Sequence, residues 1–264
     1  MKMKKNNNNY HKYNMNGIFY FSSTGNSLYI AEQIKAELGG EIRFIPKFTG
    51  DVNAYDKIII VSPIHSYGLP TLVYNFIANM KSAKPLYIVL NCGGLQANAP
   101  YFAYQLCKEN ELNIRSVQVV MMPEIYTLTF SQPKFVINNA LRKAPKRLTS
   151  VITAIRNDNE IIIPKPRRDK WTPKHLKNRK KWHMLATHFT ITEDCSDCQK
   201  CIRICPVGNI KHENGHIVFG EKCIACLSCY HRCPEKAIVY KNRRKKDRYI
   251  NPLIKEKNIG ADQL

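Results

Sequence analysis

Short apolar runs alternate with segments of helical periodicity along the first 157 residues. Apolar or β-branched runs, typical of strands covered on both faces, lie at 18–21, 42–46, 57–63, 85–94 and 116–123. Apolar residues at helical spacing fill the intervals at 28–38, 72–80, 100–111 and 135–157. Pro145 is expected to break or kink the last helix. This α/β alternation predicts a doubly wound, five-stranded parallel sheet over residues 17–157.

The rest of the chain is organised by charge and by cysteine. The stretch KPRRDKWTPKHLKNRKKW (165–182) lies in what we expect to be a basic linker, residues 158–187. The cysteines indicate a small second domain at 188–240, and a basic tail follows at 241–264. Residues 1–16, which include the run NNNN, are expected to form a disordered tail.

Composition narrows the class of protein. With 264 residues, 44% of them hydrophobic, the chain can bury a core. No run reaches the roughly 18 apolar residues of a membrane helix. The basic start resembles a signal peptide, but polar SSTGNS interrupts any apolar region, so a cytoplasmic location is predicted. Ten cysteines in that compartment favour metal binding over disulfides.

Eight of these cysteines form an internal repeat. Cys195, Cys198, Cys201 and Cys205 recur 28 residues later as Cys223, Cys226, Cys229 and Cys233, and each fourth cysteine precedes a proline. The spacing C-x2-C-x2-C-x3-C-P is that of bacterial two-cluster iron–sulfur proteins, in which the fourth cysteine serves the other cluster. We therefore assign one 4Fe–4S cluster to Cys195, Cys198, Cys201 and Cys233, and the second to Cys223, Cys226, Cys229 and Cys205. The repeat also predicts two copies of one unit related by a pseudo-twofold axis.

Structural zinc is the alternative interpretation of the repeat. Zinc sites usually pair two C-x-x-C knuckles across a longer loop, and a third cysteine with a Cys-Pro in each copy does not fit that pattern. Cys92 and Cys107 stand apart from the repeat, and both are compatible with small core residues.

The turn SSTGNS (22–27) lies between the first strand and the first helix, where an open parallel sheet binds phosphate. Gly25 lets the backbone approach an oxyanion. Neutral donors come from the hydroxyls of Ser22, Ser23, Thr24 and Ser27 and from the amide of Asn26. The turn has no lysine, which favours a phosphomonoester that is held rather than transferred. The alternative is a polar loop that caps a helix.

The segment FSSTGNS resembles the phosphate loop of flavodoxins, which bind FMN. A flavodoxin-like domain followed by a two-cluster bacterial ferredoxin-like module resembles a family of bacterial and archaeal fusion proteins, the EFR-type ferredoxins. The resemblance covers residues 17–240 and implies FMN, two 4Fe–4S clusters and electron transfer. It also implies that residues 188–240 form an α+β bacterial ferredoxin-like domain.

The resemblance also implies loops that hold the isoalloxazine ring. They are SPIHSYGLP (62–70) and NCGG (91–94), with the candidate residues Pro63, His65, Tyr67, Gly68, Asn91, Cys92, Gly93 and Gly94. Tyr67 is expected to stack on the flavin, whereas His65 stands where the family pattern has an aromatic residue. Tyr126, in MPEIY, is expected to close the site. Ordinary turn chemistry is the alternative for each loop.

Three function classes remain. The first is an electron carrier or redox adaptor, whose basic residues, among them Arg179, Lys180 and Lys181, would steer an acidic redox partner protein. The second is an FMN-dependent reductase with an organic substrate over the flavin, which an apolar pocket around Tyr67 and Tyr126 would favour. The third is a nucleic-acid-binding protein, which the formal net charge of +21 would suit. In that case Trp171, Trp182 and Tyr249, which lie in or next to basic stretches, would be stacking platforms for bases. No nucleophile–base pair and no G-x-G-x-x-G fingerprint occurs, so catalytic residues and use of NAD(P)H gain no support.

Overall fold

The computed structural model describes residues 15–241 and 247–260, so much of both predicted tails lies outside the described residues. Five parallel strands form one sheet in the order β2-β1-β3-β4-β5. They are β1 (Asn16–Tyr20), β2 (Glu41–Phe44), β3 (Lys57–Pro63), β4 (Leu86–Cys92) and β5 (Ile114–Met121). The predicted doubly wound, five-stranded sheet is therefore confirmed.

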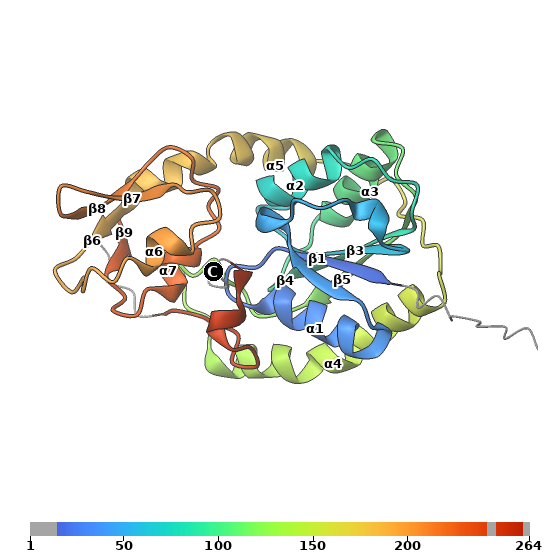
Figure 1. Ribbon diagram of the computed structural model, residues 1–264, viewed down its shortest axis with the longest axis horizontal. Coiled ribbons are helices and arrows are strands. Elements are labelled where there is room, and N and C mark those ends of the chain that lie inside the picture. The colour runs from blue at the N-terminus through green and yellow to red at the C-terminus, as the bar shows by residue number, and fades with distance from the viewer. Residues whose placement is uncertain (1–14, 242–246, 261–264) are drawn as a thin grey trace, which may run out of the picture.

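Helices cover both faces of the sheet, as Figure 1 shows. Helices α1 (Asn26–Leu38) and α4 (Lys134–Arg156) bury one apolar face. Helices α2 (Thr71–Ala78) and α3 (Ala99–Glu109) cover the other face. Single-turn 3-10 helices η1 (Ile45–Lys47) and η2 (Val52–Ala54) connect β2 to β3. The central strands β3 and β4 are buried on both sides, as their apolar composition predicts.

Helix α4 continues through Pro145, where the sequence predicted a break or a kink. A proline removes one backbone hydrogen bond, but it does not remove the apolar stripe that binds the helix to the sheet. Leu141, Ala144 and Leu148 are buried around the proline, while Pro145 itself is exposed. Burial of this stripe offsets the lost hydrogen bond.

The segment expected as a basic linker contains helix α5 (Trp171–Lys180) and the 3-10 helix η3 (Trp182–His188). Three of its side chains are buried: His175 is 0% exposed, Ala186 2% and Trp182 8%. The ring of His175 lies 5.0 Å from that of Phe102 in α3. The lysines and arginines therefore cover the outer side of a helix that packs onto the first domain.

The cysteine-containing domain is built from two short antiparallel sheets and two short helices. Strand β6 (Phe189–Ile191) pairs with β9 (Ile238–Tyr240), and β7 (Ile210–Glu213) pairs with β8 (His216–Phe219). The helices are α6 (Lys200–Arg203) and α7 (Ser228–Arg232). This arrangement fits the predicted α+β ferredoxin-like module.

Backbone conformation repeats along with the cysteines. Positive φ angles occur in pairs whose members stand 28 residues apart: Asp197 and Ala225, Gln199 and Leu227, and Gly208 and Lys236. Non-glycine residues rarely adopt this conformation, so its recurrence shows that the two halves share one backbone path. Strands β6 and β8 occupy equivalent positions, and each pairs with a strand from the other half.

The described part of the C-terminal tail, residues 247–260, returns to the first domain. It contains the 3-10 helix η4 (Glu256–Asn258) and lies between the two domains, drawn in red in Figure 1. Tyr249, Ile254 and Ile259 are buried there. None of the helices in the described residues is long and apolar enough to cross a membrane.

Candidate functional site

Residues 22–27 form a buried loop between β1 and α1. The side chains that offer donors are 6% exposed or less; they are Ser22, Ser23, Thr24, Asn26 and Ser27. Gly25 has a φ of +97°, in the left-handed region, and its amide donates a 3.0 Å hydrogen bond to Ser22 Oγ. This bond closes the turn, and glycine makes the conformation accessible.

Backbone amides of this loop are arranged to receive an anion. Within the described residues, no hydrogen-bond partner meets the N–H groups of Ser23, Thr24, Asn26, Ser27 and Leu28. The first intrahelical bond of α1 runs from Tyr29 N to Gly25 O, at 2.8 Å. The Ser23 hydroxyl is also buried without a hydrogen-bond partner. A buried helix N-terminus with uncapped amides suits a phosphate, so this loop fits the phosphate group of FMN.

The Asn26 side chain, by contrast, is already engaged. Its Nδ2 donates to the carbonyl of Pro123 at 2.9 Å. Its Oδ1 accepts from the Tyr249 hydroxyl at 2.7 Å and from Asn251 Nδ2 at 3.1 Å. The sequence predicted this amide side chain as a phosphate donor, but here it braces the loop, and only the backbone N–H of Asn26 lacks a partner.

The loop after β3 adopts a strained turn that lines a cavity of about 660 Å³. His65 and Gly68 exchange backbone hydrogen bonds, and Ser66 and Tyr67 have positive φ values of 43° and 75°. The ring of His65 is edge-on to that of Trp182, 5.8 Å away. Burial, with a contribution from His175, lowers the pKa of His65 to about 4, so the imidazole is neutral at pH 7.

Helix α5 fixes this turn through His175. Its Nδ1 lies 3.1 Å from the carbonyl oxygens of both His65 and Ser66, so Nδ1 carries the proton and donates to them. A Cβ on Gly68 would lie 2.5 Å from the His175 ring, so only glycine fits there. Tyr67 also packs on α5, because its ring centroid is 4.4 Å from that of Trp171.

The loops after β4 and β5 complete the cavity. Gly93, in the loop after β4, fits tightly against the loop after β5, since a Cβ on Gly93 would lie 2.4 Å from the Cα of Glu124. The Glu124 carboxylate accepts hydrogen bonds from the N–H groups of Ile125 and Tyr126, at 2.8 and 2.9 Å. Burial raises the pKa of Cys92 to about 11, which keeps its thiol protonated. Asn91 and Pro63 are paired in register at the ends of β4 and β3, and Asn91 Nδ2 donates to Ser27 Oγ at 2.9 Å.

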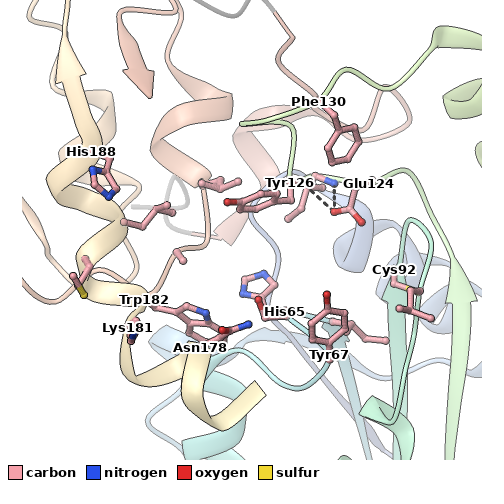
Figure 2. Close-up of a pocket in the computed structure, with 18 residues that line it drawn as sticks. His65, Tyr67, Cys92, Glu124, Tyr126, Phe130, Asn178, Lys181, Trp182 and His188 are labelled. Carbon is pink, nitrogen blue, oxygen red and sulfur yellow. Dashed lines mark hydrogen bonds between the residues drawn. The ribbon is translucent and has the colours of Figure 1, made fainter. Parts of the chain in front are cut away.

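These loops enclose one side of a cavity of about 660 Å³. Tyr67 and Tyr126 face it from opposite sides, as Figure 2 shows. Trp182 and Leu185 of η3 form a third wall, and Ala225 and Leu227 of the cysteine-containing domain also line it. Residues of both domains therefore share a cavity that is large enough for a flavin ring system.

The eight repeated cysteines surround two further cavities. The first cavity is lined by Cys205, Cys223, Cys226 and Cys229, which we call the proximal set. The second cavity is lined by Cys195, Cys198, Cys201 and Cys233, which we call the distal set. Each set thus takes three cysteines from one motif and the fourth from the other, as crossed ligation requires. Within the described residues, no three metal-binding side chains converge on a single-ion site.

Burial distinguishes the two sets. It raises the pKa of Cys226 to about 12 and places that of Cys229 well above its usual value, and neighbouring cysteines raise both further. Four thiolates in one such cavity require a cation to bind them, and iron in a cluster supplies that charge. In the distal set Cys198 is exposed. The proximal set adjoins the flavodoxin-like domain, because Ser23 and Cys226 line one small cavity.

Two family models match parts of the chain. Residues 17–129 match a flavodoxin domain, and residues 194–238 match a 4Fe–4S dicluster domain. No curated protein matches the chain. The chain therefore combines a flavodoxin domain with a 4Fe–4S domain, which supports FMN and 4Fe–4S clusters as cofactors and an electron-transfer role.

The solved structures similar to this chain include bacterial flavoproteins. A flavoprotein from Lactobacillus acidophilus in complex with FMN is 18% identical, covers 40% of this chain and 93% of its own, and has a TM-score of 0.35. A Fusobacterium nucleatum flavodoxin bound to FMN is 14% identical. The match covers 55% of this chain and 99% of the flavodoxin, with a TM-score of 0.39. Two-electron reduced Megasphaera elsdenii flavodoxin is 19% identical, with 40% and 85% covered and a TM-score of 0.35.

Several residues at the site escaped the sequence analysis. His175, Arg232 and Asn251 are buried polar residues without a local motif, and their positions depend on contacts with distant segments. Trp182 and Tyr249, considered above as stacking platforms for nucleic acid, are 8% and 6% exposed and pack inside the protein. They are therefore unavailable to stack on bases, although their places in basic stretches suggested exposure.

Proposed function

We propose that the protein transfers electrons between one FMN and two 4Fe–4S clusters, as a redox carrier or adaptor of the EFR-type family. One observation carries this proposal. Ala225 and Leu227, which flank Cys226 of the proximal set, line the same cavity as His65 and Tyr126 of the flavin loops. A flavin ring in this cavity would thus lie against the segment that ligates the nearer cluster.

The residues of this chain divide the work of such a site. FMN, when bound, accepts two electrons and releases them singly, and each cluster carries one. Trp182 and Leu185 give the cavity an apolar wall, while the neutral ring of His65 adds no charge beside the flavin. His175 keeps the strained loop at Tyr67 in one conformation. Such a site is preorganised for electron exchange without conformational change.

The two sets suggest an order of transfer. The proximal set borders the flavin cavity, whereas the distal set contains the exposed Cys198. We propose that electrons pass between the flavin and the proximal cluster, then to the distal cluster, and there to a partner protein. Lysines on α5 would draw an acidic partner by electrostatic steering.

Anaerobic reconstitution with iron, sulfide and FMN tests the proposal. We expect about eight iron and eight sulfide per chain, from the ligand count of two cubanes, together with one FMN. Stepwise reduction followed by optical and EPR spectra would count the redox centres. Stoichiometric zinc without labile sulfide, or no bound flavin, would contradict the proposal.

A second candidate function is reduction of an organic substrate. The cavity of about 660 Å³ favours it, because Phe130, Tyr126 and Leu95 offer an apolar and partly exposed mouth. An FMN-dependent reductase should oxidise its reduced cofactors rapidly with a small quinone, at a rate that saturates with quinone concentration. A rate linear in quinone and unchanged by Tyr126→Ala would favour the adaptor.

A further inference from the structure

The C-terminal segment, residues 247–260, forms an outer wall of the phosphate loop. The backbone N–H of Asn251 donates a 2.8 Å hydrogen bond to the carbonyl of Thr24. The Tyr249 hydroxyl donates to Asn26 Oδ1 at 2.7 Å. Further along, the Gly260 amide donates to the Tyr20 hydroxyl at 3.1 Å. The segment follows the cysteine-containing domain in sequence, yet it contacts both the loop and the end of β1 before it.

The fit of this segment against the loop is close. A Cβ on Gly25 would lie 3.2 Å from both Asn251 Cβ and Ile259 Cδ1, and 3.3 Å from Ile254 Cβ. Ile254 and Ile259 are 7% and 0% exposed and belong to the apolar core beneath α1. The loop is therefore enclosed, and a ligand there would be held from two sides.

Arg232, the last residue of α7, lies inside this enclosure. It is 3% exposed and lines one small cavity with Ser22 and Ser23 of the loop. Its guanidinium is oriented by the C-terminal segment: Nη1 donates to the carbonyl of Ile259, and Nη2 to that of Glu256, each at 3.2 Å. Its Nε is 3.3 Å from the Glu256 carboxylate. A fixed cation thus stands beside a phosphate loop that has no lysine.

Helix α7 is tied to both cysteine sets. Cys229 within the helix belongs to the proximal set, and Cys233 directly after it belongs to the distal set. Because α7 is only one turn long, these two ligands help to hold it in position, together with the hydrogen bonds of His231 and Arg232. Loss of the clusters would remove two of the attachments that keep Arg232 in its place.

We propose that Arg232 binds the FMN phosphate and thereby makes retention of FMN depend on the iron–sulfur clusters. The inference rests on the proposed function, since it requires both cofactors. Helix α7 is the mechanical link: cluster ligands at its end fix the guanidinium that completes the phosphate site. FMN and the clusters then stabilise each other's binding, because such coupling is reciprocal.

The first test compares Arg232→Gln with Arg203→Gln. Arg203 lies on helix α6 of the first repeat, is exposed, and donates a 3.0 Å hydrogen bond to the backbone carbonyl of Cys198, a residue of the distal set. Arg232→Gln should weaken FMN about tenfold or more and leave riboflavin, which lacks the phosphate, nearly unaffected. Arg232→Lys should recover part of the FMN affinity, and Arg203→Gln should bind as wild type. Equal weakening of FMN and riboflavin by Arg232→Gln would make Arg232 merely structural and overturn the proposal.

The second test needs no substitution. Iron is removed anaerobically from the wild-type protein with a chelator, and the dissociation constants of FMN and riboflavin are measured by flavin fluorescence before and after. We expect FMN affinity to fall about tenfold or more, and by more than that of riboflavin. Unchanged FMN affinity would overturn the coupling. An intact protein that binds no FMN before iron removal would instead contradict the proposed function, which separates the two failures.

Discussion

His231 Nε2 of the iron–sulfur domain donates a 2.7 Å hydrogen bond to the carbonyl of Ile125, in the loop that follows β5 of the flavodoxin domain. The other ring nitrogen, Nδ1, accepts a 3.2 Å hydrogen bond from the Tyr249 amide. Burial lowers the pKa of His231 to about 4, so the ring is neutral and its tautomer follows from the two partners. One imidazole thus joins the loop after β5, helix α7 and the C-terminal segment.

Cys205→Ser should damage the proximal cluster, whose other three ligands lie in the second cysteine motif. Cys205 lies with Cys223, Cys226 and Cys229, so its loss removes one ligand of the proximal cluster. Iron and sulfide analysis with EPR of the reduced protein should show one intact cluster with the distal signature. The matched variant Cys195→Ser should lose the distal cluster instead. If Cys205→Ser spares the proximal cluster, the crossed assignment is wrong.

Thr24→Val should weaken FMN but not riboflavin. Thr24 is 1% exposed in the phosphate loop, and valine removes its hydroxyl without a large change in shape. Loss of a hydrogen bond to a charged group costs about 1.5–3 kcal/mol, so FMN affinity should fall about tenfold or more. Fluorescence titration measures both ligands, with exposed Thr149→Val as the control. Equal losses for FMN and riboflavin would show that residues 22–27 do not hold the phosphate.

His65→Phe should reduce the acid sensitivity of the fold. Burial holds the pKa of His65 at about 4, below the 6.5 of the unfolded chain, so its neutral form stabilises the protein above about pH 6.5. That contribution is lost as pH falls toward 4, by about 2 kcal/mol between pH 7 and pH 5. Chemical unfolding at the two pH values should therefore show a smaller loss of unfolding free energy in His65→Phe than in wild type. Exposed His183→Phe is the control, and an unchanged pH dependence in His65→Phe would refute the assignment.

Lysines on α5 should steer an acidic redox partner. Arg179 is omitted from the test because its guanidinium stacks 3.8 Å from the ring centre of Tyr74, whereas Lys177 and Lys180 are exposed. The double change to Gln should slow electron exchange with an acidic ferredoxin severalfold at low salt. The difference should shrink as salt rises, because exposed charges are screened beyond about 8 Å at physiological ionic strength.

The matched control for this test is the pair Lys143→Gln and Lys146→Gln on α4, which covers the opposite face of the sheet. These changes alter net charge equally and should leave the exchange rate close to that of wild type. Wild-type exchange by the α5 variant, with loss of tight binding to single-stranded nucleic acid, would replace the docking proposal with a nucleic-acid role.

The sheet and the grouping of cysteines could be predicted because each rests on a local pattern. The run Ile58–Val61 is β-branched and buried on both faces, so its composition alone indicates a central strand. Cysteine spacing likewise limits which residues can surround one cluster. Such patterns are written into a few neighbouring residues.

The enclosure of the phosphate loop could not be predicted in this way. Tyr249 and Asn26 are 223 residues apart in sequence, and the basic run around Tyr249 suggested a solvated tail. His175 is one buried residue in a helix whose other faces carry lysine and arginine, so periodicity gives no signal for it. Both depend on how the two domains pack, which no local pattern records.

Photoreduction of the bound flavin, followed by the absorbance changes of flavin and clusters, tests electron transfer within one chain most directly. A short light pulse in the reconstituted protein should be followed by re-oxidation of the flavin and matching bleaching of the clusters. We predict a first-order rate constant that does not change with protein concentration and that survives in Cys195→Ser, which retains the proximal set. A rate proportional to protein concentration, or no cluster bleaching, would contradict transfer between the flavin and the cluster at Cys226.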